Sequence, residues 1–281
     1  MNIRKAFVVL AGLLILPTIA NAQGGFAPPE LAIHEVRENI YVIRSGFSGN
    51  VTVLVSDEGV VLVDDKFEMD HDGVMELIRS VTDQPVRYVI NTHLHGDHTG
   101  GNARMQGLGA DVISSLNARL IMAEAQDSGL PNITMTDYMR VYLGDFVIDL
   151  HYMGRGHTDG DIVIHLPEER LVIMGDLFAL FGPYESVVHY GAGGSLRDWP
   201  RSLDNALKLD FDTVIPGHSG LTDRSEIEGY RDYLTRIGET VREMNQAERS
   251  REDIQAVLES EFGWGGLSMG LGLDGVITEM R

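Results

Sequence analysis

The sequence predicts an α+β fold in which two β-sheets pack face to face and helices cover both outer sides, an αββα sandwich. Two observations support this prediction. Short apolar runs bounded by glycine, asparagine, aspartate and proline dominate the middle of the chain, as is typical of strands. Helical patterns follow the strands in each half of the sequence. With 281 residues, 43% of them hydrophobic, the chain is long enough to bury a large core.

The predicted elements follow one another in a definite order. Strands are predicted over residues 40–43, 51–55, 60–63, 86–90, 141–143, 146–150, 161–166, 171–174 and 213–215. Helices are predicted over residues 74–81, 117–125, 198–207, 223–245 and 252–260. The final segment, residues 263–272, is rich in glycine, methionine and leucine. It is either a flexible flap over a pocket or a packed tail.

The amino-terminal residues have the features of a signal peptide. Arg4 and Lys5 precede an apolar run over residues 6–19, and Ala-Asn-Ala at 20–22 has the small residues of a cleavage site. A retained membrane anchor is the weaker interpretation, because the run falls short of the roughly 20 residues of a spanning helix and contains Pro17. We therefore expect a periplasmic or secreted protein with a leader at 1–22, a single domain at 23–281 and no membrane contact after cleavage.

The net charge and the absence of cysteine limit which partners and which metal ligands the protein can have. The chain carries 22 basic and 42 acidic residues, a formal net charge of −20, so it repels polyanions and a nucleic-acid partner is not expected. It contains no cysteine, which excludes disulfides, thiolate nucleophiles and thiolate metal ligands. Any bound metal must therefore be held by histidine, aspartate or glutamate.

Residues 91–102 read Asn-Thr-His-Leu-His-Gly-Asp-His-Thr-Gly-Gly-Asn and directly follow a predicted buried strand. A packed core gains nothing from several adjacent imidazoles, and a solvated loop does not need them, so this density indicates metal binding. Imidazole nitrogen and carboxylate oxygen suit zinc where thiolates are absent. In an extended chain His93 and His95 point the same way and can share one ion, whereas Asp97 and His98, beyond the next glycine, suit a second ion.

Three further candidate ligands, His157, Asp176 and His218, lie downstream. Each directly follows a glycine and comes just after an apolar, strand-like run. Strand ends along one rim of a sandwich are rigid positions at which side chains distant in sequence can converge. We therefore expect these three side chains to join the histidine-rich segment in one site.

These motifs resemble those of the metallo-β-lactamase superfamily. His-Leu-His-Gly-Asp-His at 93–98, Gly-His at 156–157, Gly-Asp-Leu-Phe at 175–178 and Pro-Gly-His at 216–218 occur in this order, and the similarity extends from Val60 to His218. The resemblance implies a four-layer αββα fold with two zinc ions per chain at one edge. The ligands it implies are His93, His95 and His157 for the first ion, Asp97, His98 and His218 for the second, and Asp176 bridging both.

Two further aspartates are expected near these ligands. The resemblance suggests that Asp64, at the end of its strand, is an acid that orients a metal-binding histidine. Asp161 is a candidate for a similar role. For both residues an ordinary strand-end or turn aspartate is an equally good interpretation.

The remaining five histidines match no ligand position. We expect His34 and His71 at the surface, and His151 and His165 at ordinary strand positions. The fifth, His189, lies in a stretch after the bridging aspartate that is a candidate wall of the substrate pocket.

Other candidates for the pocket are Lys66, Arg155, Tyr190 and Trp264. Lys66 and Arg155 are cations that could hold a substrate carboxylate. Tyr190 is a candidate hydrogen-bond donor to the oxyanion, and Trp264 lies in the segment that is a candidate flap.

The function that follows is hydrolysis of a small-molecule substrate. Two adjacent zinc ions lower the pKa of a shared water toward about 7, so hydroxide is available without a side-chain nucleophile. Such a hydroxide attacks an amide-like or ester-like bond, as in a lactone or β-lactam, while the metals stabilise the oxyanion and the leaving group. Asp97 is the catalytic candidate, because it can orient the nucleophile while it binds metal.

A β-lactamase proper is the first alternative. Many true β-lactamases carry cysteine where this chain has Asp176 and lysine three positions later, where this chain has Ala179. Efficient β-lactam hydrolysis would then need Lys66, Arg155 or Arg197 as the substitute cation. A phosphodiesterase ranks third.

Two alternatives belong to different functional classes. One is an iron-bound redox protein of the same fold, but its diiron branch usually carries glutamate where this chain has His95. The other is a non-catalytic zinc-binding protein. The natural substrate, the metal bound in the cell and the oligomeric state are left open by the sequence.

Overall fold

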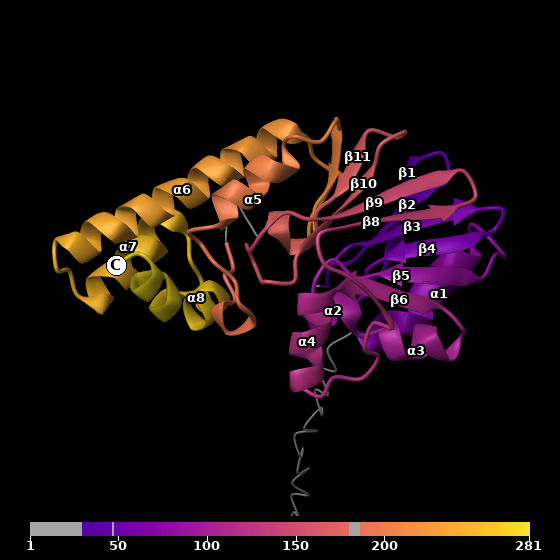
Figure 1. Cartoon of the computed structure of the whole chain (residues 1–281), viewed down its shortest axis with the longest axis horizontal. Coiled ribbons are helices and arrows are strands. Elements are labelled where there is room, and N and C mark those ends of the chain that lie inside the picture. Colours follow the sequence, from indigo (N-terminus) through magenta and orange to yellow (C-terminus); the bar gives the residue numbers. More distant parts are fainter. Residues whose placement is uncertain (1–29, 47, 180–185) are drawn as a thin grey trace, which may run out of the picture.

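The computed structural model describes residues 30–46, 48–179 and 186–281 (Figure 1). The leader predicted at residues 1–22 lies outside these ranges. Within the described part of the chain, no helix combines the length and the apolar character needed to cross a membrane.

The first sheet has seven strands that lie side by side in the order of the sequence. They are β1 (Ala32–Arg37), β2 (Ile40–Arg44), β3 (Val51–Ser56), β4 (Gly59–Val63), β5 (Val86–Ile90), β6 (Asp111–Ser115) and β7 (Ile133–Met135). Strands β1 to β4 pair antiparallel. From β4 to β7, each strand pairs parallel with the next.

The second sheet has five strands in the order β12-β11-β10-β9-β8. They are β8 (Tyr138–Leu143), β9 (Phe146–Tyr152), β10 (Ile162–Leu166), β11 (Leu171–Ile173) and β12 (Thr213–Ile215). The pairs among β8 to β11 are antiparallel, and only β11 and β12 pair parallel. Each sheet thus takes up one half of the chain.

Helices cover the outer faces of both sheets (Figure 1). Helices α1 (His71–Arg79) and α3 (Asn102–Gly107) pack on the first sheet. Helices α5 (Trp199–Ala206), α6 (Arg224–Gln246), α7 (Arg251–Phe262) and α8 (Gly266–Glu279) form one core with the outer face of the second sheet. The short helices α2 (Gly96–Thr99), α4 (Leu116–Glu124), η1 (Glu68–Asp70), η2 (Gly175–Phe178) and η3 (Tyr190–Ala192) lie in the connections.

Strand residues alternate between two buried faces. In β4, Val60 and Leu62 belong to the cluster with α1, whereas Val61 and Val63 belong to the cluster between the two sheets. All five residues of β4 are buried. Because both faces of this strand are covered, it has a continuous apolar sequence instead of an alternating one.

The predicted α+β sandwich is confirmed, and β5 and β12 have the predicted bounds. The segment 263–272 is a packed part of the molecule, because it ends α7 and forms the first half of α8. His71, expected at the surface, is instead 3% exposed. It begins α1 on the same face as Val74 and Ile78, which packs on the sheet. His34 is exposed, as expected.

The carboxyl ends of several strands lie at one edge of the sandwich. β4 and β5 are parallel, and so are β11 and β12. β9 runs in the direction of β11, because both pair antiparallel with β10. Residues that follow these strands therefore leave the sheets together.

Candidate metal centre

Four of the predicted ligands, His93, His95, His157 and Asp176, form a first group. Their ligand atoms all lie within 4.8 Å of one another. Nδ1 of His95 lies 3.1 Å from Nε2 of His93 and 2.8 Å from Nε2 of His157. His93 and His95 follow β5, whereas the other two follow β9 and β11, so the group draws on both sheets.

The other three, Asp97, His98 and His218, form a second group, whose ligand atoms also lie within 4.8 Å of one another. Nε2 of His218 lies 3.2 Å from Oδ2 of Asp97 and 3.4 Å from Nε2 of His98. Asp97 and His98 belong to α2, and His218 follows β12. This group also needs both sheets.

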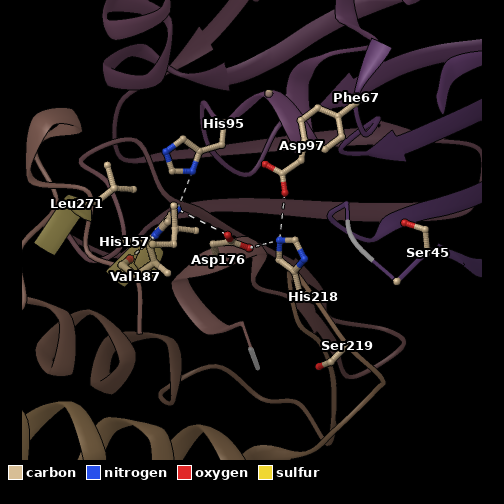
Figure 2. Close-up of a pocket in the computed structure, with 13 residues that line it drawn as sticks. Ser45, Phe67, His95, Asp97, His157, Asp176, Val187, His218, Ser219 and Leu271 are labelled. Carbon is tan, nitrogen blue, oxygen red and sulfur yellow. Dashed lines mark hydrogen bonds and ion pairs between the residues drawn. The ribbon is translucent and has the colours of Figure 1, made fainter. Parts of the chain in front are cut away.

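Asp176 lies between the two groups (Figure 2). Its Oδ2 is 3.6 Å from Nε2 of His157 and 3.9 Å from Nε2 of His93, both in the first group. Its Oδ1 is 3.4 Å from Nε2 of His98 and 3.5 Å from Nε2 of His218, both in the second. The two oxygens of one carboxylate thus face different groups.

Two glycines allow this placement of Asp176. Gly175 has a φ of +51°, and a Cβ on it would lie 2.3 Å from Oγ1 of Thr92. A Cβ on Gly217 would lie 2.0 Å from Oδ1 of Asp176. The loops after β11 and β12 can therefore approach the site this closely only where the chain has no side chain.

Asp64 lies behind two of the histidines. Its Oδ2 accepts a hydrogen bond of 2.8 Å from Nδ1 of His98 and one of 2.8 Å from Oγ1 of Thr92. Nδ1 of His93 in turn lies 3.1 Å from Oγ1 of Thr92. Asp64 therefore contacts His98 directly and reaches His93 through Thr92.

The outer partner of His157 is a backbone group. Its Nδ1 donates to the backbone carbonyl of Val187 at 2.6 Å. Asp161, a candidate either for orienting a histidine or for an ordinary turn, accepts from the backbone N–H and from Oγ1 of Thr158, at 2.9 and 2.5 Å. Its carboxylate is used to close the turn before β10 and is not directed at an imidazole. Complete burial raises the pKa of Asp161 to about 6.

His189 lies behind His95 and does not line the pocket described below. Its Nδ1 is 2.8 Å from Nε2 of His95, and the two rings stack with their centroids 5.0 Å apart. The backbone N–H of His189 donates to the carbonyl of His157 at 2.9 Å. His189, a candidate for the pocket wall, thus contacts two histidines of the first group instead.

The outer hydrogen bonds determine which ring nitrogens carry hydrogen. Nδ1 of His157 must be a donor, because the carbonyl of Val187 can only accept. Nδ1 of His93 must also be a donor, because the hydroxyl of Thr92 gives its single hydrogen to a carboxylate. The Nε2 lone pairs of both rings then face Nδ1 of His95. Nitrogen atoms arranged in this way fit a metal cation between them.

The pKa values show that the second group favours positive charge. Burial opposes a charge on His98, but the carboxylates of Asp176 and Asp64 outweigh it and raise the pKa of His98 to about 10. Burial is also outweighed at His218, where Asp176 and Asp97 raise the pKa to about 8. The carboxylates of this group therefore stabilise positive charge at His98 and His218.

Burial favours the neutral form of His93 and His95 in the first group. Burial, together with the neighbouring His157, lowers the pKa of His95 to about 3 against the opposing effect of Asp176. The pKa of His93 lies well below its usual value for the same reasons. Neutral imidazole is the form that binds metal.

The two groups open into a pocket of about 710 Å³ (Figure 2). The residues that line it are Ser45, Gly46, Phe67, His95, Gly96, Asp97, His157, Asp176, Val187, His218, Ser219, Leu267 and Leu271. Five of the seven candidate ligands are thus reached from the pocket. His93 and His98 lie behind them and are fully buried.

Two basic residues expected in the pocket lie outside it. Lys66 is fully buried, and its Nζ donates to the backbone carbonyl of Gly49 at 2.5 Å. It therefore holds the loop between β2 and β3 and cannot contact substrate. Arg155 forms an ion pair with Asp198, with 2.9 Å between Nε and Oδ2, at the surface beside α5. Arg197 is exposed and does not line the pocket either.

The two aromatic candidates, Tyr190 and Trp264, also lie outside the pocket. The hydroxyl of Tyr190 donates to Oε2 of Glu279 at 2.7 Å, so it is directed at α8 and away from any oxyanion. Trp264 is 2% exposed, and a Cβ on Gly272 would lie 3.0 Å from its ring. Both aromatic side chains therefore pack against α8.

Some residues of the site were not predicted. Thr92 and Val187 hold histidines, and Val187 does so through a backbone carbonyl that carries no signal in the sequence. Leu267 and Leu271 line the pocket. Their spacing of four would have placed them on one helical face, but the glycines around them obscured the helix.

Comparisons with known proteins agree with this geometry. The profile of the metallo-beta-lactamase superfamily matches residues 44–218, which is more than half of the chain. The metallo-beta-lactamase type 2 of Bacillus cereus is 27% identical over 205 residues, covering 69% of this chain and 78% of that protein. That of Elizabethkingia meningoseptica is 25% identical over 244 residues, covering 83% of this chain and 95% of that protein.

A solved structure shows the same fold. A metallo-beta-lactamase from Pontibacter korlensis matches with a TM-score of 0.67 at 21% identity, covering 73% of this chain and 99% of that chain. The resemblance inferred from the sequence motifs is thereby confirmed. The chain belongs to the metallo-β-lactamase superfamily and is a metal-dependent hydrolase of that superfamily.

Proposed function

We propose that this chain is an exported hydrolase that uses two zinc ions to cleave an amide-like or ester-like bond, such as that of a lactone or a β-lactam. The observation that carries the proposal is the position of Asp176, whose two oxygens face two separate groups of nitrogen and oxygen donors. One carboxylate between two such groups fits a pair of ions better than a single ion. Because cysteine is absent, the donor set suits zinc without thiolates.

The first ion would be held by His93, His95 and His157. The second would be held by Asp97, His98 and His218, with Asp176 between the two ions. These assignments are supported by the convergence of the Nε2 atoms of His93 and His157 on Nδ1 of His95, and by the short distances among the atoms of the second group.

Zinc held in this way supplies hydroxide at neutral pH. The residues of the chain would position the reactants. Asp97 lines the pocket and is one-fifth exposed, with Oδ2 3.2 Å from Nε2 of His218. Its carboxylate is therefore placed to accept a hydrogen bond from the attacking water and to receive its proton.

Export is supported by the leader pattern at residues 1–22. Its test is amino-terminal sequencing of the protein recovered from the periplasm or the medium, where the mature chain is expected to begin at Gln23. A cytoplasmic protein that still begins with Met1 would contradict export.

Hydrolysis of β-lactams is a second candidate, because two relatives are metallo-beta-lactamases of type 2. The pocket opposes efficient turnover of these anions. Ala179 stands where many β-lactamases have lysine, and none of the substitute cations considered, Lys66, Arg155 and Arg197, lines the pocket. We therefore place lactones and other esters first, and phosphodiesters last.

The test is a rate panel with zinc-loaded protein on acyl-lactones, thioesters, a chromogenic cephalosporin and bis-nitrophenyl phosphate. Metal analysis is expected to give about two zinc ions per chain, and a chelator is expected to remove activity that added zinc restores. Iron with oxygen-dependent turnover would overturn the proposal. Bound zinc with no turnover of any substrate would favour a non-catalytic role.

A further inference from the structure

The walls of the pocket differ in chemistry. Leu271 and Val187 lie on the side of His157, whereas Ser45 and Ser219 lie on the side of His218 (Figure 2). Leu267 adds to the apolar side, because it precedes Leu271 by one turn of α8 and lines the same pocket. One half of a substrate thus meets aliphatic side chains, and the other half meets the hydroxyl groups of Ser45 and Ser219 together with the ring of Phe67, which lies beside Asp97 (Figure 2).

No lysine or arginine is among the described residues that line the pocket. Residues 47 and 180–185, which the structure does not describe, contain no basic residue in the sequence. Arg44 lines an adjoining hollow on the Ser45 side, where Glu30 and His34 also lie. A substrate carboxylate would therefore find no cationic side chain beside the apolar wall.

The helix that carries Leu267 and Leu271, α8, is anchored at its carboxy-terminal end. Glu279, near the end of α8, accepts hydrogen bonds from Oη of Tyr190 at 2.7 Å, from Oγ of Ser195 at 2.5 Å and from the backbone N–H of Arg197 at 3.1 Å. Leu273, Val276 and Ile277 of α8 belong to the core on the outer face of the second sheet. Leu267 is nevertheless 60% exposed, so aliphatic surface remains uncovered at the mouth of the pocket.

We propose that the site is selective for uncharged esters and lactones whose acyl group carries an aliphatic chain, with the chain against Leu267 and Leu271 and the leaving group toward Ser45 and Ser219. The inference rests on the proposed hydrolase function. The reaction breaks the bond between the acyl carbon and the ester oxygen. Water supplies the oxygen that joins the acyl carbon and the proton that joins the leaving alkoxide. An open-chain ester gives a carboxylic acid and an alcohol, and a lactone gives a single hydroxy acid.

The experiment measures kcat/KM of the zinc-loaded protein on nitrophenyl esters from acetyl to octanoyl, and on the hemisuccinate as the anionic analogue. Burial of each added methylene is expected to raise kcat/KM by about threefold to fourfold. The double variant Leu267→Ala and Leu271→Ala should lose most of this dependence, so that its rates on the long-chain esters fall toward its rate on the acetyl ester. Leu120→Ala is the matched control, because Leu120 is 58% exposed on α4 outside the pocket.

Leu267→Lys provides an independent test of charge selectivity. It places a cation at the apolar wall and should raise kcat/KM on the hemisuccinate relative to the butyryl ester. The inference is wrong if the acetyl ester is hydrolysed but chain length has no effect, if the hemisuccinate is the better substrate of the natural protein, or if Leu120→Ala changes the chain-length dependence as much as the pocket variant does.

A binding measurement separates this inference from the hydrolase function. Affinities of alkanamides from acetamide to octanamide, measured by ligand-observed NMR, should rise with chain length and lose this trend in the double variant. If no ester is hydrolysed but the amide trend is present, the proposed function fails and the apolar site stands. If esters are hydrolysed but neither the ester rates nor the amide affinities depend on chain length, the proposed selectivity is wrong and the proposed hydrolase function is kept.

Discussion

Oδ2 of Asp64 lies 2.8 Å from Nδ1 of His98, in a position shielded from solvent, although 34 positions separate the two residues. The carboxylate fixes the orientation of the ring and leaves its Nε2 directed at Asp97, Asp176 and His218. An outer partner of this kind increases the basicity of the ligand and fixes its tautomer.

Asp64→Asn is therefore expected to weaken zinc binding by about tenfold to a hundredfold. The amide keeps the shape of the side chain but removes the charge that favours His98 as a donor. Zinc affinity is measured by competition with a chromogenic chelator. Asp72→Asn is the control, because the side chain of Asp72 is 81% exposed and far from the site in the fold, on α1. Equal affinities for the two variants would refute the role of Asp64.

His189→Ala is expected to weaken zinc at the first group, because it removes the acceptor for Nε2 of His95. His189→Asn should restore most of the affinity, since its amide oxygen can accept the same hydrogen bond. The absorption of the cobalt-substituted protein reports the geometry at this group independently of turnover. His34→Ala serves as the control, because His34 is exposed. A spectrum unchanged in His189→Ala would exclude a positioning role.

Asp97→Ala is expected to lower kcat by about 10²-fold to 10⁴-fold, because it removes the carboxylate placed to orient the nucleophile and receive its proton. The fold should change little, since Asp97 lies at the wall of an open pocket. Rates are measured at saturating zinc, with circular dichroism as the check on folding and Asp83→Ala, at an exposed position, as the control. Unaltered turnover in Asp97→Ala would show that another group performs this task.

The buried Lys66 gives stability a specific dependence on pH. Burial lowers its pKa from 10.5 to about 8, against the opposing effect of Asp70, Asp97 and Asp64. Between these values the unfolded chain holds a proton that the folded protein has released, so the free energy of unfolding rises with pH in this window. The rise attributable to Lys66 is at most about 3 kcal/mol.

Lys66→Met should remove this contribution. Urea unfolding at about pH 7 and about pH 10 measures it, as the difference between the pH dependence of the natural protein and that of the variant. The contributions of other groups that titrate between these pH values are the same in both proteins and cancel in the difference. The same pH dependence in both proteins would mean that Lys66 keeps its ordinary pKa when buried.

Secondary structure is predicted best from the sequence where the intrinsic propensity of a segment agrees with its packing in the fold. β5 and β12 are β-branched runs bounded by turn residues, and both have the predicted bounds. β7 has only three residues, and the exposed residues of β1 make its apolar pattern weak. α8 contains several glycines, which disfavour a helix in isolation. Two of them allow close packing, at the rings of Trp264 and Tyr190, so tertiary contact overrides propensity.

The seven candidate ligands were identifiable because three imidazoles and a carboxylate crowd into residues 93–98, and because the other three each follow a glycine just after a strand-like run. The residues that line the pocket were not identifiable, because proximity in sequence to a ligand does not give the direction of a side chain. Lys66 is two residues from Asp64 but turns beneath the loop at Gly49. Arg155 is two residues from His157 but turns outward to Asp198.

Neither half of the chain contains a complete metal group. The segment before β8 supplies two residues to each group, and the remaining donors come after β9, β11 and β12. A metal ion held there is a cross-link between the amino-terminal and carboxy-terminal halves, and its binding free energy opposes their separation. A complete metal group would thus form only after the two halves have docked during folding. A molecule with both metal groups filled is therefore one in which both halves are assembled.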